Sequence, residues 1–313
     1  MRPLRIAVLG AGTMGPGIAA AFASAGHSAS LWARTPERAR TGVEAAAELT
    51  RFLSDAGLAT AAGPADERIA EAGALEDAAS ADVVVEAVSE ELETKRTLLA
   101  EVDGLLPPER LIATNTSGLR VTDIAAPLRH RARVVAMHFW NPAHLMPLVE
   151  VGGGEDTPDQ ALEAAVELVR GIGKQPVRLR REVLGFLGTR LQQAVVREAI
   201  ALLEEGVASA EDIDLAVRTS FGIRFPVVGP LESADLTGLD VIEAIHRYLL
   251  PDLDRSVEPQ RALSERVAAG ALGTKTGRGF HDWTRRDAGE LARRRDEELV
   301  RRLHLLAEEK GTG

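Results

Sequence analysis

The chain contains no cysteine. This excludes disulfide bonds, thiolate nucleophiles and metal sites with cysteine ligands, and it is consistent with a reducing compartment. The chain also lacks any run of about 18 apolar residues, so we expect no transmembrane helix and no membrane partner. The first residues, Met1–Leu4, lead directly into an apolar run and show no signal peptide or lipidation motif. We therefore expect a cytoplasmic protein.

Positive charge is in deficit. The sequence has 37 Lys and Arg residues against 47 Asp and Glu residues, a formal net charge of −10. A nucleic-acid partner would require a broad basic face, so we expect none. One local basic pocket would still suffice for a small phosphorylated ligand. The length of 313 residues predicts two domains.

The first 180 residues alternate short apolar runs with helical patterns. Such alternation is typical of a parallel sheet that is covered by helices on both faces. The predicted strands are Leu4–Leu9, Ala29–Ala33, Asp82–Ala87, Leu111–Thr114, Val134–His138, Leu148–Val151 and Gln175–Leu179. The predicted helices between them are Thr13–Ala25, Glu37–Gly57, Leu92–Leu106 and Pro158–Gly171.

After Leu179 no further strand pattern occurs. A long helix is predicted over Leu184–Glu205, with Gly206 as its C-terminal stop. Further helices are predicted over Val241–Leu249, Pro259–Ala269 and Ala288–Glu309, and Ser209 with Asp212 predicts the start of another. We place the domain boundary in the exposed Arg-Arg-Glu connection, which gives domains of residues 1–182 and 183–313.

A glycine-rich turn follows the first predicted strand and opens the first predicted helix. Its sequence is Gly10-Ala11-Gly12-Thr13-Met14-Gly15. The first glycine permits a tight turn, the second allows backbone to approach a pyrophosphate, and the third allows close helix–strand packing. The N–H groups of the helix N-terminus then favour a phosphate. We predict an α/β fold with a Rossmann-type N-terminal domain that binds a dinucleotide, followed by an all-α C-terminal domain.

The end of the second predicted strand indicates which dinucleotide is bound. NAD sites usually carry Asp or Glu there to accept the ribose hydroxyls. Here the residue is Ala33, followed by Arg34 and Thr35. The missing carboxylate removes repulsion of a 2′-phosphate, and Arg34 and Thr35 can bond to that phosphate. NADP(H) is therefore the expected cofactor. The alternative is NAD(H), in which case Arg34 is a solvated surface residue.

The segment from His138 to Glu150 is the strongest candidate for catalysis. His138 lies at the C-terminal end of a predicted strand, where doubly wound sheets bind their ligands. A histidine there can act as general acid or base on a carbinol or carbonyl oxygen. Glu150 can orient and charge-stabilise it if the intervening turn brings the two together. We interpret Trp140 as a packing residue.

A set of spaced motifs resembles the 3-hydroxyacyl-CoA dehydrogenase family over almost the whole chain. Besides the glycine turn and His138 to Glu150, the motifs are Val85-Glu86-Ala87 with Glu90 and Lys95, Asn115-Thr116-Ser117, Gly185-Phe186, Gly229-Pro230-Leu231-Glu232 and Lys275-Thr276-Gly277-Arg278-Gly279-Phe280. The resemblance implies a catalytic His138–Glu150 dyad. It implies a homodimer, in which the helical domain forms the interface and closes over the substrate.

The resemblance also implies further site residues. Ser117 matches a serine near substrate and nicotinamide, and Asn141 matches an asparagine beside the nicotinamide. Glu90, Lys95 and Lys275 match positions that contact the cofactor. Simpler interpretations remain open: a surface ion pair for Glu90 and Lys95, a solvated loop residue for Lys275, and turn chemistry for Ser117.

Two departures from the family bear on the acyl substrate. Thr189 stands where the family usually has an asparagine that contacts the substrate carbonyl. The helical region 36–62 contains no lysine, whereas related enzymes use one there for the coenzyme A phosphates. We expect an oxidoreductase that acts on a 3-hydroxyacyl or 3-oxoacyl substrate, with His138 as general acid–base. The alternatives are a carrier-bound or free hydroxy acid as substrate, and a non-catalytic, crystallin-like nucleotide-binding protein.

Overall fold

The computed structural model describes residues 2–311, which form two compact units. Of these, residues 2–189 and 294–311 belong to the first unit, and residues 190–293 form the second. We therefore treat residues 294–311 with the first unit, although they belong to a helix that begins in the second.

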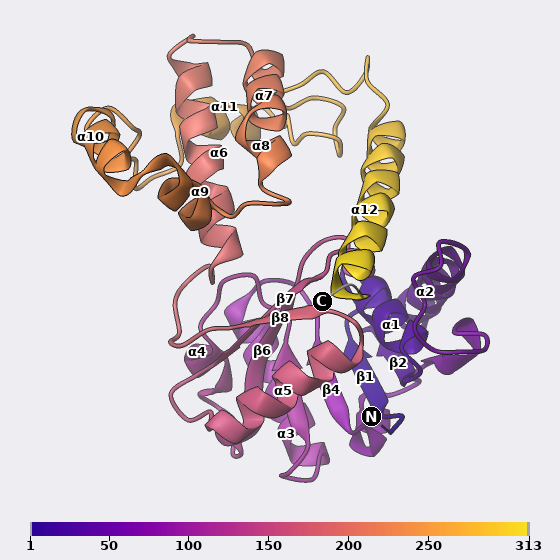
Figure 1. Ribbon diagram of the computed structural model, residues 1–313. Coiled ribbons are helices and arrows are strands. Elements are labelled where there is room, and N and C mark those ends of the chain that lie inside the picture. Colours follow the sequence, from indigo (N-terminus) through magenta and orange to yellow (C-terminus); the bar gives the residue numbers. More distant parts are fainter. Residues whose placement is uncertain (1, 312–313) are drawn as a thin grey trace. The chain divides into compact units, whose positions relative to one another are not determined.

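The first unit is built on one eight-stranded sheet (Figure 1). The strand order is β3-β2-β1-β4-β5-β6-β7-β8. The order changes direction between β1 and β4, which both lie next to the glycine turn. The strands are β1 (Arg5–Leu9), β2 (Ser28–Trp32), β3 (Ile69–Glu71), β4 (Val83–Glu86), β5 (Leu111–Thr114), β6 (Val134–Phe139), β7 (Leu148–Gly153) and β8 (Gln175–Arg178).

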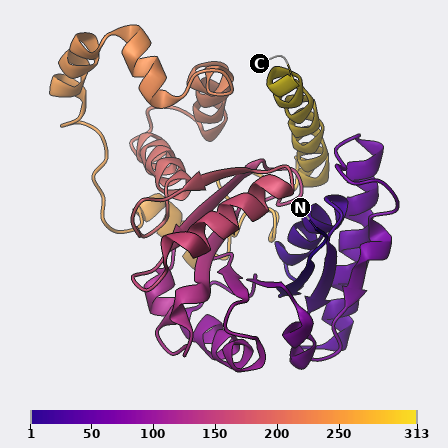
Figure 2. The ribbon, with the colours of Figure 1, turned by 60° about the horizontal axis from the view of Figure 1, so that its bottom comes forward.

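Helices cover both faces of this sheet because alternate strand residues point to opposite sides. On one side Val8, Val85 and Met137 pack against apolar residues of α1, α2 and α5. On the other side Leu9 and Val84 pack against α3 and α4. Figure 2 shows the two layers from a second direction. The helices are α1 (Gly15–Ser24), α2 (Pro36–Asp55), α3 (Leu92–Leu105), α4 (Val121–Ala125) and α5 (Asp159–Gly171), with short 3-10 segments η1 (Asp66–Arg68), η2 (Leu75–Ser80) and η3 (Arg131–Arg133).

The last helix, α12 (Ala288–Gly311), joins the first unit through its C-terminal part. His304 Nε2 donates a hydrogen bond of 2.9 Å to the carbonyl oxygen of Ala56, just beyond the end of α2. His304 also lies 3.7 Å from the place where a Cβ on Gly57 would stand.

The second unit is helical, and it buries little of its apolar surface. Within residues 190–293, all of which the structure describes, the buried hydrophobic residues are Ile200 and Ala262. The Ser209 side chain caps α7 by accepting a hydrogen bond from the Asp212 N–H at 3.1 Å, as the sequence predicts. The helices are α6 (Gly188–Glu204), α7 (Ala210–Thr219), α8 (Phe221–Arg224), α9 (Pro230–Thr237), α10 (Leu239–Leu249) and α11 (Arg261–Ala268).

The predicted class, a Rossmann-type α/β domain followed by helices, is confirmed, and two details differ. First, the sheet is mixed, because β7 runs antiparallel to β6 while β8 is parallel to β7. Second, β3 was not predicted; three residues are too few to produce a periodic pattern. The domain bounds 1–182 and 183–313 stay a prediction; compactness alone groups residues 2–189 with 294–311.

None of the helices between residues 2 and 311 combines the length and the apolar character that crossing a bilayer requires.

Candidate active site

The glycine turn joins β1 to α1 and leaves space on one side. Gly10 has φ +119°, and a Cβ there would stand 2.5 Å from the Ala87 carbonyl oxygen. A Cβ on Gly15 would stand 1.8 Å from the Gly10 carbonyl oxygen, so the third glycine is required for the close helix–strand approach. A Cβ on Gly12 would meet nothing within 4 Å. Gly12 therefore faces open space where a ligand can approach the backbone.

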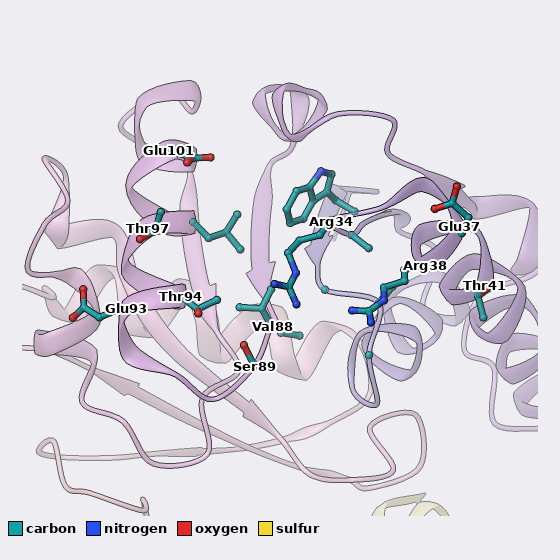
Figure 3. A pocket seen from close by; sticks show the side chains of 17 residues that line it. Arg34, Glu37, Arg38, Thr41, Val88, Ser89, Glu93, Thr94, Thr97 and Glu101 are labelled. Carbon is teal, nitrogen blue, oxygen red and sulfur yellow. The ribbon is translucent and has the colours of Figure 1, made fainter.

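That open space belongs to a cavity of about 850 Å³ at the carboxyl ends of β1, β2 and β4 (Figure 3). Its volume lies within the roughly 300–1,000 Å³ usual for ligand pockets. One wall is formed by the glycine turn, the end of β2 and the start of α2, and the opposite wall by the β4–α3 connection and α3. The lining includes Gly10, Gly12, Trp32, Ala33, Arg34, Glu37, Arg38, Thr41, Val88, Ser89, Thr94 and Thr97.

Two arginines extend into this cavity. Arg34 follows β2 and Arg38 lies in the first turn of α2; Figure 3 shows both guanidinium groups directed toward the middle, whereas the Glu37 carboxylate points away. Thr35 is the N-cap of α2, and its Oγ1 accepts a hydrogen bond from the Arg38 N–H at 3.4 Å. The expected contact of Thr35 with a phosphate stays a prediction, since its hydroxyl is used as a helix cap.

The N-terminus of α1 is available for an anion. Its N-cap residue is Met14, no side chain caps the first turn, and that turn contains no acidic residue. Unpaired N–H groups and the helix dipole then favour a phosphate group beside Gly12. The open glycine, the uncapped helix and the two arginines together fit a dinucleotide, with its pyrophosphate at α1 and its ribose at the end of β2.

His138 and Glu150 are brought together by the pairing of two strands. β6 and β7 are antiparallel, and His138 lies directly opposite Glu150 in their register. Directly paired residues project from the same face with Cβ atoms about 4.5–5.5 Å apart, so the two side chains meet. His138 Nδ1 lies 2.8 Å from Glu150 Oε2. Both side chains are buried, at 7% and 1% exposure. The turn between the strands therefore does what the predicted dyad requires.

The Glu150 carboxylate accepts four hydrogen bonds. Oε2 faces His138 Nδ1 and also Trp140 Nε1, at 3.1 Å. Oε1 accepts from the backbone N–H groups of Leu187, at 2.8 Å, and Gly188, at 2.9 Å. Burial raises the pKa of Glu150, but the bonds from His138, Gly188, Leu187 and Trp140 outweigh burial and lower the pKa below its ordinary value. The carboxylate is thus held as an anion against the imidazole.

Two aromatic rings lie close to the imidazole. The centroids of the Trp140 and Phe186 rings each lie 5.5 Å from that of His138. Phe186 is fully buried and adopts φ +48°, directly after Gly185 at φ +76°. A phenylalanine in the left-handed region is strained, and we attribute its position to the tight turn that aims two backbone N–H groups at Glu150.

A second buried network lies behind Ser117. Lys95 Nζ bonds to both Glu86 oxygens, at 2.8 and 3.0 Å, and lies 3.2 Å from Glu90 Oε2. Glu90 Oε1 accepts from Thr116 Oγ1 at 2.6 Å and from the Ser117 N–H at 2.7 Å. Burial raises the pKa of Glu90, but the Thr116 bond and the Lys95 charge outweigh burial and lower it.

Lys95 is paired inside the protein, and its expected contact with the cofactor stays a prediction. The Lys95 side chain is 1% exposed and does not line the cavity, and its ammonium group pairs with the carboxylates of Glu86 and Glu90. This is a buried network and not a surface ion pair. Glu90, at 41% side-chain exposure, instead fixes the backbone of the exposed Ser117.

The remaining predicted site residues are placed as follows. Asn141 is exposed directly after Trp140, beyond the end of β6. Thr189 is half-buried in the first turn of α6, next to the Gly188 N–H that binds Glu150. Lys275 is exposed in the second unit. Their contacts with substrate or cofactor stay predictions. Among residues 2–311 no group of three or more potential metal ligands converges.

Sequence reasoning missed two residues of the site. Arg38 lies four positions after Arg34, and the helix start at Pro36 was a signal that both could face one pocket. Trp140 was interpreted as packing, although a buried indole N–H normally requires a partner. That requirement was a signal that the Trp140 N–H could bond to the dyad nearby.

Comparisons with known proteins give matches over both parts of the chain. Residues 5–183 match the family model described as 3-hydroxyacyl-CoA dehydrogenase, NAD binding domain, and residues 185–283 match the corresponding C-terminal domain. The chain is 34% identical over 299 residues to the 5-formyl-3-hydroxy-2-methylpyridine 4-carboxylate 5-dehydrogenase of Mesorhizobium japonicum, covering 94% of this chain and 96% of that protein.

Two solved structures are also similar. A crystal structure of a 5-formyl-3-hydroxy-2-methylpyridine 4-carboxylic acid 5-dehydrogenase, described as an NAD⁺ dependent dismutase, matches with a TM-score of 0.90 and 32% identity, covering 97% of this chain and 99% of that one. The (S)-3-hydroxybutyryl-CoA dehydrogenase from Ralstonia eutropha matches with a TM-score of 0.73 and 33% identity, covering 90% of this chain and 99% of that one.

Proposed function

The chain belongs to the 3-hydroxyacyl-CoA dehydrogenase family and is a nicotinamide-dependent dehydrogenase, and on that premise we propose that it interconverts a small 3-hydroxy acid and its 3-oxo form with NADP(H). The observation that carries the proposal is the buried His138–Glu150 pair, which a strand register places at the same end of the sheet as the dinucleotide cavity. The nicotinamide, when bound, exchanges a hydride with the substrate.

His138 is the general acid–base of this proposal. Its Nδ1 faces the Glu150 carboxylate, so Nε2 is the ring nitrogen that can exchange a proton with the substrate oxygen. Glu150 orients the imidazole and stabilises its charged form, because the carboxylate is held as an anion by four donors. Ser117 and Asn141 are proposed to contact the substrate and the nicotinamide, and Lys275 the cofactor. This intact pair argues against a non-catalytic, crystallin-like role.

NADP(H) is proposed because the ribose end of the cavity is cationic. Ala33 provides no carboxylate, and Arg34 and Arg38 both extend into the cavity. Two guanidinium groups can hold a 2′-phosphate between them through charge-assisted hydrogen bonds. With NADPH as donor, reduction of the oxo acid is the favoured direction in cells.

The cofactor proposal is tested by kcat/KM with NADPH and NADH in parallel. Wild type should prefer NADPH, and Arg38→Ala should lower kcat/KM for NADPH by about 10- to 150-fold, since a hydrogen bond to a charged group contributes roughly 1.5–3 kcal/mol. Ala33→Asp combined with Arg34→Ala should reverse the preference. Arg40→Ala is the matched control, because Arg40 pairs with Glu71 at 3.8 Å outside the cavity. A tenfold preference of wild type for NADH would overturn the proposal.

A substrate that is not joined to coenzyme A is proposed on two observations. The segment 36–62, which the structure describes completely, offers no lysine; of its arginines, Arg38 lines the dinucleotide cavity, Arg40 pairs with Glu71, and Arg51 pairs with Asp66 at 3.4 Å. In addition, the TM-score is 0.90 for the pyridine carboxylate enzyme and 0.73 for the 3-hydroxybutyryl-CoA enzyme. Turnover of free 3-oxo acids, their CoA thioesters and carrier mimics, compared at 340 nm, decides between them.

A homodimer is proposed from the apolar surface of the second unit. Large apolar side chains there are strongly exposed, among them Val227 and Leu231 at 81% and Leu236 at 79%. A unit of this size normally encloses a core of its own, but this one buries only Ile200 and Ala262 among its hydrophobic residues. A second copy provides an equally large apolar surface, so a two-fold interface would cover both. We expect sedimentation at twice the chain mass, and Leu231→Glu should shift the protein toward monomer. A wild type that sediments as a monomer would contradict this.

A further inference from the structure

Trp140 lies directly beside the proposed acid–base pair and shares its carboxylate oxygen. Glu150 Oε2 is 2.8 Å from His138 Nδ1 and 3.1 Å from Trp140 Nε1. An indole Nε1–H can only donate, so this contact is a hydrogen bond from Trp140 to the carboxylate. Two donors on different residues therefore converge on one oxygen atom, and the backbone N–H groups of Leu187 and Gly188 occupy the other.

The indole ring packs directly against the Gly188 backbone, in space that is free because glycine has no side chain. A Cβ at Gly188 would stand 2.4 Å from Trp140 Cζ2 and 3.2 Å from Cε2. The ring therefore fills the space that any other residue at 188 would need, and it cannot swing toward that backbone. The Trp140 ring also lies near the His138 ring, with centroids 5.5 Å apart and planes inclined by 49°. These contacts leave the N–H aimed at Oε2.

The shared oxygen has a consequence for the imidazole. A carboxylate that accepts on one oxygen from backbone and on the other from the indole has no freedom to rotate about its Cγ–Cδ bond. Oε2 then stays at the position where His138 Nδ1–H finds it, and His138 Nε2 is directed away from Glu150. Without the indole bond, the imidazole alone would hold Oε2, so the carboxylate and the ring could turn into further orientations. In those where Nδ1 no longer faces Oε2, the other ring tautomer can form.

We propose that Trp140 is a positioning residue of the dyad, whose indole N–H fixes the Glu150 carboxylate and through it the tautomer and orientation of His138. The inference rests on the proposed function only in its kinetic consequence, since the arrangement of the imidazole can be measured without turnover.

The decisive variant is Trp140→Phe, which keeps an aromatic ring against Gly188 and removes the N–H. We expect the single-turnover rate of hydride transfer, followed at 340 nm, to fall about three- to tenfold, or about 0.7–1.4 kcal/mol at 1.4 kcal/mol per decade. The KM for cofactor should stay unchanged, because Trp140 does not line the cavity. Trp283→Phe is the matched control, since it also removes an indole N–H and none of the four bonds to the Glu150 carboxylate comes from Trp283. An unaltered rate in Trp140→Phe would overturn the proposal.

A double-mutant cycle separates positioning from general support of the fold. In a Glu150→Gln background, Trp140→Phe should cause little further loss, because both substitutions act through one imidazole. Independent, multiplying losses would mean that Trp140 only supports packing, and would count against the proposal.

Nitrogen NMR of the histidine ring provides the readout that needs no substrate. Wild type at a pH where His138 is neutral should show one tautomer, with the proton on Nδ1, and Trp140→Phe should show a mixture of the two. If wild type turned over no oxo acid, but the tautomers of wild type and Trp140→Phe differed in this way, the proposed function would fail and the positioning role would stand. If wild type were active and both proteins showed the same single tautomer, the positioning role would fail alone.

Discussion

Replacing Glu150 by glutamine tests the whole arrangement of the dyad with the loss of one charge and almost no change of shape. In the protein, four donors face two carboxylate oxygens: His138 Nδ1 and Trp140 Nε1 on one, and two backbone N–H groups on the other. A glutamine presents one oxygen and one NH₂ group. Whichever way the amide is turned, its NH₂ group must face a pair of donors.

The two orientations of the amide have different costs. With NH₂ toward the backbone, the N–H groups of Leu187 and Gly188 lose their acceptor. With NH₂ toward the ring, Trp140 loses its acceptor and His138 must change tautomer, so its Nε2 carries the proton. Each buried donor left unpaired costs about 1–3 kcal/mol of unfolding free energy, so the first orientation costs roughly 2–6 kcal/mol and the second, with Trp140 alone unpaired, about 1–3 kcal/mol. The glutamine takes the cheaper orientation, so we expect a loss of about 1–3 kcal/mol. Loss of a correctly poised general base costs about 10²–10⁴-fold in rate.

Two measurements check this prediction. Urea unfolding of wild type and Glu150→Gln gives the difference in unfolding free energy, and single-turnover kinetics with reduced cofactor gives the rate. Glu150→Asp is the comparison variant, because it keeps the charge and both oxygens but withdraws them by one methylene. We expect the aspartate variant to unfold closer to wild type than the glutamine variant. A glutamine variant with the unfolding midpoint and hydride-transfer rate of wild type would refute the reasoning.

Three further predictions concern the proton, the substrate and pH. His138→Gln should lower kcat by about 10²–10⁴-fold with little change in cofactor affinity; retention of substantial turnover would place the proton transfer elsewhere. Wild type should be weakly active on acetoacetyl-CoA, and Thr189→Asn should raise that activity by roughly 2- to 12-fold, because it restores one hydrogen bond worth about 0.5–1.5 kcal/mol. High wild-type affinity with no gain in the variant would show that Thr189 is neutral. Lys174 donates to the carbonyl oxygens of His144 and Met146 in the β6–β7 turn, and burial lowers its pKa to about 7. Between about pH 7 and pH 10.5 the unfolded chain then binds more protons than the folded protein. Wild type should therefore gain unfolding free energy with rising pH relative to Lys174→Met, with a slope of at most about 1.4 kcal/mol per pH unit. Parallel curves of stability against pH for the two proteins would contradict this.

Local signals made the cofactor half of the site predictable. The glycine turn needs only a strand before it and a helix after it, and the steric demands at Gly10 and Gly15 come from neighbouring backbone. The absence of an acid at Ala33 could likewise be read directly. Most helices and strands were placed within a few residues, because their apolar periodicity is a property of short segments. The strand β3 escaped because it is too short for periodicity.

The sequence by itself therefore determined the class of fold, the position of the dinucleotide turn and the residue types available for catalysis. The tertiary structure alone decided which of these residues touch. His138 meets Glu150 because β7 turns back antiparallel in one particular register, and a shift of one residue would place Glu150 on the opposite face. Trp140 and the N–H groups of 187 and 188 reach the same carboxylate from separate segments, and Lys95 is withdrawn into the interior by two acids. Contacts of this kind depend on backbone paths that join distant segments, and no local pattern in the chain encodes them.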